Sequence, residues 1–140
     1  MGHITYTQGE NHMLQSYFHG LAFTGPFYVG LGSGPKPASE DATLADIIEV
    51  TGLNYARQPI MRDDSAYGWN IVGDTAFGTE VTFTNLDNLE CWEPADYIFL
   101  TLSPSAQDAD DILIASADMS QTILLDAEQV LRVVFKFRQL

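Results

Sequence analysis

The clearest alternation of apolar and polar side chains in the chain runs over residues 130–138. Successive side chains of a β-strand point to opposite faces, so this segment is predicted to be a single strand. One face is wholly apolar and is expected to lie on the core, whereas the other face is basic. The apolar face comprises Leu131, Val133, Phe135 and Phe137, and the basic face carries Arg132, Lys136 and Arg138.

Several shorter runs of apolar, aromatic and β-branched residues are also typical of strands. Val81 and Phe83 alternate with threonines, so one face of their run is expected to be buried. Residues 97–102 are nearly all apolar, as in a strand that is covered on both faces. Pro59 interrupts its run, which places that run at a sheet edge or marks a break. Together with 130–138, the predicted strands are residues 27–32, 54–62, 69–72, 79–84, 97–102, 111–117 and 122–125.

Glycines recur at every second position in and just after the run 27–32, at Gly30, Gly32 and Gly34. Glycine inside a strand marks a bend, a bulge or a place where another backbone comes close. We therefore expect an early, bent strand that later strands cover. It would join the N-terminal arm to the body of the protein.

The N-terminal third of the chain has a different pattern. Residues 1–9 alternate weakly, and we expect an extended arm, or an edge strand if they find a partner. Apolar residues at helical spacing predict short helices over 11–18 and 42–49. One face of the first helix carries Met13, Leu14, Tyr17, Phe18 and Leu21, and one face of the second carries Leu44, Ile47 and Ile48.

These elements predict a mainly β fold, namely an antiparallel β-sandwich or jelly-roll-like body with an N-terminal arm and one or two short helices. A parallel sheet needs helices between its strands, and no helical pattern follows residue 50. The length of 140 residues suits a single domain. We assign residues 1–25 to the arm and first helix, and residues 26–140 to the body.

Charge and hydropathy narrow the range of partners. The chain has 19 acidic and 6 basic residues, a net charge of −13, which disfavours nucleic acid because phosphate binding needs lysine and arginine. No apolar run approaches the roughly 20 residues of a membrane helix, and the N-terminus has no pattern of a secretory signal. Half of the basic residues fall in 132–138, and such clustering favours a specific protein partner.

No group of residues has the spacing that catalysis or a resident metal needs. Cys91 is the only cysteine, so it forms no internal disulfide, and we expect it to be buried or half-buried beside Trp92. His12 and His19 lie two helical turns apart and are interpreted as ordinary surface or interface residues. We therefore predict no enzymatic activity, no metal site and no cofactor.

Two acidic clusters could in principle bind a cation or act in catalysis. The first comprises Asp108, Asp110, Asp111 and Asp118; it lacks the turning glycine and distal acid of a calcium loop and is interpreted as a solvated loop, with cation binding left open. The second comprises Glu90, Glu93 and Asp96 and flanks Trp92, but nothing in the sequence fixes the carboxylate separation that a glycosidase needs.

Eight residues are predicted to lie at protein interfaces. Arginine and aromatic residues are enriched at interface hot spots, and the N-terminal arm has no obvious core of its own to join. For the pairs Tyr55–Arg57 and Arg62–Trp69, a plain pairing on the surface of a sheet is an equal alternative. The predicted interface residues are Ile4, Tyr6, Tyr55, Arg57, Arg62, Arg132, Lys136 and Arg138.

Several segments, taken in order, resemble small structural proteins of tailed bacteriophages, which include tail-fibre or minor structural proteins and capsid decoration (cement) proteins. The most telling piece is Tyr55-Ala56-Arg57-Gln58 following Val50-Thr51-Gly52. The resemblance runs from about residue 13 to residue 140, and the helix at 44–48 and the acidic loop at 108–111 depart from it. Its other segments are residues 27–32, 81–83, 92, 97–100 and 112–115, and the closing strand.

The resemblance implies a component of the phage particle that is made in the host cytoplasm. It also implies a homo-oligomer, with a trimer as the first expectation, and contacts with the major capsid protein or other virion proteins. A tail location, as a fibre, baseplate or adaptor protein, is the alternative. A carbohydrate-binding or hydrolytic β-sandwich is a more remote one, suggested by Trp69 and Trp92 with acids nearby.

Overall fold

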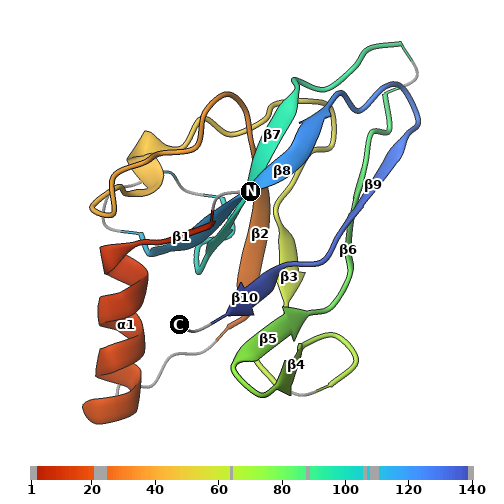
Figure 1. The fold of residues 1–140 in the computed structure, drawn as a ribbon. Helices are drawn as coiled ribbons and strands as arrows, with labels where there is room; N and C mark the ends of the chain where they lie inside the picture. Colours follow the sequence, from red (N-terminus) through yellow and green to blue (C-terminus); the bar gives the residue numbers. More distant parts are fainter. Residues whose placement is uncertain are drawn as a thin grey trace.

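The computed structural model describes residues 3–20, 25–63, 65–87, 89–105, 107 and 111–138 of the chain. Within these residues the protein is mainly β, with antiparallel sheets of five, three and two strands and one α-helix near the N-terminus (Figure 1). The elements are β1 (His3–Thr5), α1 (Thr7–Phe18), β2 (Phe27–Gly32), the 3₁₀ turn η1 (Leu44–Asp46), β3 (Gln58–Ile60), β4 (Trp69–Val72), β5 (Thr75–Gly78), β6 (Val81–Thr84), β7 (Ala95–Thr101), β8 (Leu113–Ile123), β9 (Val130–Val133) and β10 (Lys136–Arg138).

The largest sheet has the order β1-β8-β7-β2-β3, with every neighbouring pair antiparallel. Its two edges confirm two predictions. Pro59 lies in the edge strand β3, where the missing N–H does not interrupt the sheet. Residues 3–5 of the arm pair with β8 at the opposite edge, so the arm joins the sheet of its own chain.

The glycines of β2 make room for aromatic rings of β7. A Cβ atom on Gly30 would overlap the ring of Phe99, and one on Gly32 would overlap the ring of Tyr97. Each glycine lies directly opposite its aromatic partner in the antiparallel pair. The predicted close approach is therefore confirmed, although side-chain rings and not a second backbone occupy the space.

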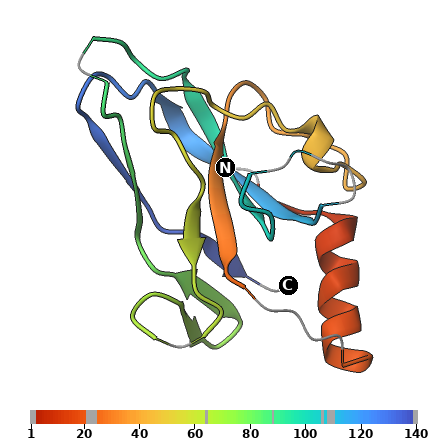
Figure 2. The ribbon, with the colours of Figure 1, turned by 180° about the vertical axis from the view of Figure 1, so that it is seen from behind.

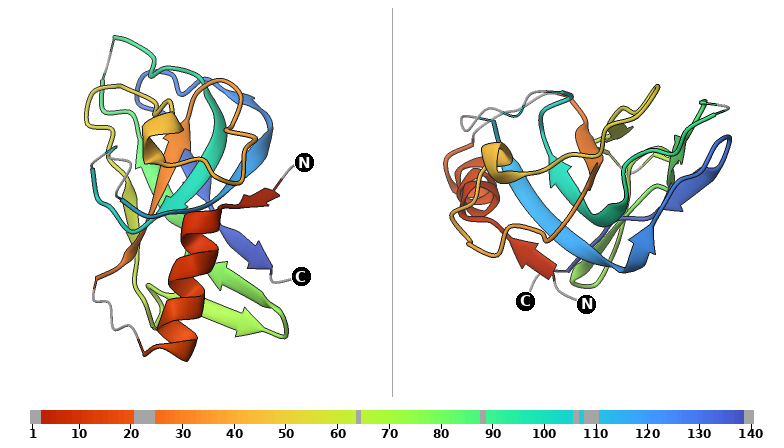
Figure 3. Two further views of the ribbon diagram at one scale, coloured as in Figure 1. Left: turned by 90° about the vertical axis from the view of Figure 1, so that its left-hand side faces the viewer. Right: turned by 90° about the horizontal axis from the view of Figure 1, so that it is seen from above.

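Both faces of the five-stranded sheet are covered. On one face the main core lies between this sheet and the smaller sheets, with Val29, Ile60, Val81, Phe83, Leu100, Ile114, Val133 and Phe135 among its buried residues. On the other face Tyr97 and Phe99 pack with Tyr6 and with Leu44 and Ile47 around η1. Figure 3 shows the segment around η1 and the β6–β9 pair on opposite sides of β7 and β8. The predicted burial of residues 97–102 on two faces is confirmed.

The run 130–138 is not one strand. β9 pairs with β6, whereas β10 pairs with β5 in a different sheet, and Val134 and Phe135 lie between them. The alternation itself holds across this break, since Val133 and Phe135 are buried and Arg132 and Lys136 are exposed. One segment therefore contributes to two sheets.

Other strand bounds also differ from the prediction. β5 was not predicted, because TAFG is short and ends in glycine. β8 extends over 11 residues and joins the separately predicted strands at 111–117 and 122–125. The strand predicted over 54–62 shrinks to the three residues of β3.

The two helical predictions fare differently. α1 exists but begins at Thr7, four residues before the predicted start. The helix predicted over 42–49 is wrong apart from the single turn η1, in which the Thr43 backbone N–H donates to Asp46 Oδ2 at 2.9 Å. Immediately afterwards Val50 N donates to Leu31 O at 3.0 Å and draws the chain alongside β2 in an extended conformation.

Candidate interaction surfaces

The basic stripe of the C-terminal segment is exposed, as its alternation predicts. Arg132 lies on β9, and Lys136 and Arg138 lie on β10. Lys136 Nζ is 5.5 Å from the centroid of the Phe77 ring on the neighbouring strand, a cation–π arrangement. The three side chains are therefore all exposed but project from two different sheets.

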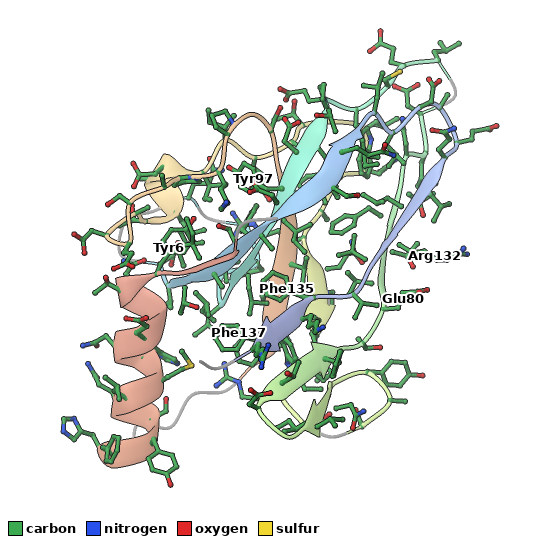
Figure 4. All side chains as sticks on the ribbon, viewed as in Figure 1. Tyr6, Glu80, Tyr97, Arg132, Phe135 and Phe137 are labelled. Carbon is green, nitrogen blue, oxygen red and sulfur yellow. The ribbon has the colours of Figure 1, made fainter. Side chains whose placement is uncertain are left out.

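Acidic residues of the same chain balance part of this stripe. Arg132 Nε lies 3.5 Å from Glu80 Oε1 on the outer side of the β6–β9 pair (Figure 4). Arg138 Nε donates to Asp74 Oδ2 at 3.1 Å, and this hydrogen bond helps to lower the pKa of the Asp74 carboxyl. Both ion pairs are well exposed, so each contributes little to stability.

Tyr55 and Arg57 come together, but inside the protein and around a third residue, Glu49. The Arg57 guanidinium donates from Nε to Glu49 Oε2 at 3.0 Å and from Nη2 to Glu49 Oε1 at 2.9 Å. Its Nη1 donates to the carbonyl oxygen of Ser103 at 2.7 Å. The side chain of Arg57 is 1% exposed, so the pair is nearly removed from water.

The Tyr55 hydroxyl extends this network. It donates to Glu49 Oε2 at 2.7 Å and accepts the backbone N–H of Leu31 at 2.9 Å. Burial, and then the neighbouring Glu49 carboxylate, raise the pKa of the Tyr55 phenol. The Glu49–Tyr55–Arg57 network thus fastens the loop before β3 to β2 and to the end of β7. This is an internal fastening, and the Arg57 side chain is not on the outer surface of the described structure.

Arg62 and Trp69 meet through a third residue as well. The Arg62 guanidinium lies 4.6 Å from the centroid of the Phe27 ring, and the Trp69 ring packs edge-on against the same ring at 5.4 Å. Burial lowers the pKa of Arg62 to about 10. The charge of Arg62, after burial, also lowers the pKa of His12 on α1, so the helix lies beside this cluster.

The two arm residues face the protein's own core. Ile4 is half-buried in β1, and Tyr6 is 0% exposed. The Tyr6 hydroxyl donates to the carbonyl oxygen of Pro37 at 2.8 Å and lies 2.6 Å from Ser116 Oγ. The expectation that the arm lacks a core within its own chain is therefore wrong, because Tyr6 is one of the largest side chains of the second core cluster.

The main surface feature that the sequence analysis did not identify is the outward apolar side of α1. The apolar stripe itself was visible at helical spacing, but its direction was not. Four of its members are exposed, and the fifth, Leu21, lies outside the described residues. The exposed members are Met13, Leu14, Tyr17 and Phe18.

The acids near Trp92 have structural partners. Glu93 accepts hydrogen bonds from the backbone and hydroxyl of Thr51, and Asp96 accepts one from the Gly34 backbone N–H at 2.6 Å. Trp92 is buried, whereas Cys91 is exposed, which corrects its expected burial. The Cys91 thiol donates to Asp126 Oδ1 at 2.9 Å, and this raises the pKa of the thiol.

In the part of the chain that the structure describes, no three His, Cys, Asp or Glu side chains gather as a metal site would require. Asp108 and Asp110 of the acidic loop lie outside the described residues. Two open hollows, of about 460 and 420 Å³, lie on the surface. The first lies along residues 35–46, and the second opens beside the Glu49–Tyr55–Arg57 network.

Comparison with protein families and with curated proteins finds no match to this chain. Among the described helices, none is long and apolar enough to cross a membrane.

Proposed function

We propose that this protein is a non-enzymatic structural component of a tailed-phage particle, and specifically a capsid decoration protein that stabilises the shell. The observation that carries the proposal is the position of Tyr55-Ala56-Arg57-Gln58, which follows Val50-Thr51-Gly52 and is the most telling part of the resemblance. Glu49, Tyr55 and Arg57 form a buried network that fastens loops to strands. The network gives this segment a structural role, and the resemblance of the segment to phage structural proteins supports the proposal.

We further infer a β-sandwich-like body for this protein. The main core lies between one face of the five-stranded sheet and the smaller sheets, which is the layer arrangement of a sandwich. A second covering layer around η1 lies on the opposite face. On a phage shell, weak contacts between such bodies and the shell would be repeated by symmetry, and together they would bind more strongly than any one of them.

We place the contact with the shell on the basic stripe, Arg132, Lys136 and Arg138. The chain as a whole carries a net charge of −13, so this stripe is its most distinctive local charge. The partners would be the major capsid protein or other virion proteins, together with further copies of the chain as a homo-oligomer, with a trimer as first expectation. A Lys136→Glu variant should bind purified shells more weakly than an Ala45→Glu variant, which changes an exposed residue of η1 on the other face of the five-stranded sheet.

The deciding experiment measures copy number in purified particles, with heads and tails separated. Co-purification with heads, at a copy number comparable to that of the major shell protein, is the expected result. Few copies, found only with tails, would replace decoration with the fibre, baseplate or adaptor alternative. Absence from both fractions would overturn the proposal as a whole.

The carbohydrate-binding alternative gains no support from the two tryptophans. Trp92 is buried, with its ring edge-on to Tyr55 and its Nε1 donating to Leu53 O at 3.1 Å. Trp69 is half-buried against Phe27. A sugar-binding platform needs an open aromatic face, and neither ring is fully exposed.

A further inference from the structure

Helix α1 packs on the protein with its small and polar side, and it turns its apolar side outward. Gly9 is buried against β8, where an added Cβ would lie 2.7 Å from Ile114 Cα. His12 and Ser16, one and two turns further along the helix, are half-buried. This is the reverse of an ordinary surface helix, in which the apolar stripe faces the core.

The exposed side forms one continuous stripe. Met13 and Leu14 are followed one turn later by Tyr17 and Phe18, so the four side chains are neighbours on the helix surface. Tyr17 is 84% exposed and Phe18 is 72% exposed, with their rings in edge contact at 5.0 Å between centroids. From its start beside β1, the helix runs away from the edge of the sheet along one side of the molecule (Figure 2).

Charge indicates what can cover this stripe. The chain carries 19 acids against 6 bases, so two copies repel each other over most of their surfaces. Between Thr7 and Phe18 the only Asp, Glu, Lys or Arg is Glu10, in the first turn, at the opposite end from Tyr17 and Phe18. The stripe is therefore a surface on which a second acidic copy can approach with little repulsion.

We propose that the stripe Met13, Leu14, Tyr17 and Phe18 packs against α1 of a second copy of this chain. This rests on the homo-oligomer of the proposed function and names one of its contacts; by itself an α1–α1 contact pairs two copies, and a trimer would need the α1 helices of three copies to meet at one axis. Two aromatic and two aliphatic side chains supply on the order of 500 Å² per copy, more than half of the roughly 800 Å² that a standard interface takes from each partner. The oligomer is accordingly expected to form in a concentration-dependent way.

The test uses the purified full chain without any phage particle, with its mass followed by sedimentation over a range of concentrations. We expect the measured mass to exceed the 15.5 kDa of one chain and to fall toward that value on dilution. The variant Tyr17→Ser/Phe18→Ser should remain at the mass of one chain. The matched control is Ile71→Ser/Val72→Ser, which alters two aliphatic side chains that are 72% and 59% exposed on β4 and should behave as the unmodified chain does.

A second measurement, disulfide cross-linking, does not depend on whether the Tyr17→Ser/Phe18→Ser variant folds. Tyr17→Cys in a Cys91→Ser background should form a disulfide-linked dimer on mild oxidation, whereas Ile71→Cys in the same background should not. A chain that stays monomeric at every concentration, or helix and control variants with equal effects, would overturn the α1 contact. Particle copy number is measured separately, so the decoration proposal and this contact can fail independently.

Discussion

The Arg57 guanidinium and the Glu49 carboxylate face each other in a two-point hydrogen-bonded pair, with both donor–acceptor distances between 2.9 and 3.0 Å. The pair links the loop before β3 to the segment that runs alongside β2. The Arg57 side chain is almost fully buried. Its removal leaves the partly buried negative charge of Glu49 without its cationic partner, and of this network only the hydrogen bond from the Tyr55 hydroxyl remains.

Arg57→Ala should therefore lower the free energy of unfolding by about 3–5 kcal/mol. Urea denaturation followed by circular dichroism measures this loss. The matched control is Arg132→Ala, which removes the exposed partner of Glu80 and should cost less than about 1 kcal/mol. Equal losses for the two variants would show that burial of the Arg57 pair has no energetic consequence.

Gly30 should not tolerate a side chain, because the Phe99 ring occupies the position of its Cβ. We expect Gly30→Ala to lower the free energy of unfolding by about 1–3 kcal/mol through overpacking. Combining it with Phe99→Leu should cost less than the sum of the two single changes, since the smaller side chain leaves room for the methyl group. Strict additivity in this double-mutant cycle would contradict the steric explanation.

A buried amide holds two loops together at the end of the molecule beyond β6. Asn85 is 0% exposed, and its Nδ2 lies within 2.9–3.1 Å of the carbonyl oxygens of Glu90, Leu125 and Asp126. Its Oδ1 accepts the backbone N–H of Asp87 at 2.9 Å. Several backbone groups therefore depend on this one side chain.

Asn85→Ala leaves those groups without their partner and should cost about 1–3 kcal/mol of unfolding free energy. Asn70→Ala, at an exposed position of β4, is the control and should change it by less than about 0.5 kcal/mol. Thermal and urea unfolding both report the difference. A loss no larger than that of the control would mean that water replaces the amide at little cost.

Alkaline pH should destabilise the fold through its buried tyrosines. Burial raises the pKa of Tyr6 and Tyr55, and it raises the pKa of Tyr97 to about 12. Above about pH 10 the unfolded chain loses phenolic protons that the folded chain retains, so ionisation favours unfolding. Stability should be constant with respect to these groups below about pH 10 and should fall between about pH 10 and pH 12.

Urea unfolding at a series of pH values checks this window, and Tyr97→Phe should make the decline shallower because it removes one of the phenols. A free energy of unfolding that stays constant up to about pH 12 would contradict the expected linkage.

Local periodicity identified most of the strands and their faces, but not the pairings that override it. The alternation of Val133 and Phe135 correctly gave the inner face, yet nothing in it marks the change of sheet between them. The helical spacing of Leu44 and Ile47 was real, but hydrogen bonding to β2 held the following residues extended. Long-range partners of this kind leave no trace in a short window of sequence.

The interaction surfaces show the same limit. Tyr55 and Arg57 were singled out as a pair, but Glu49, which joins them, lies across a loop and was not connected to them. The apolar stripe of α1 was found, but spacing alone does not say which side of a helix faces the protein. Here the buried Gly9 decides, because its close approach to β8 turns the larger side chains outward.

Strand pairing in this protein joins segments that lie far apart in the sequence. His3 pairs with Ala117, β5 pairs with β10, and β6 pairs with β9. Such a high contact order predicts folding in milliseconds to seconds, slower than a helical protein of this size. The main core cannot close until Phe135 has left the ribosome, because this residue is one of its fully buried members.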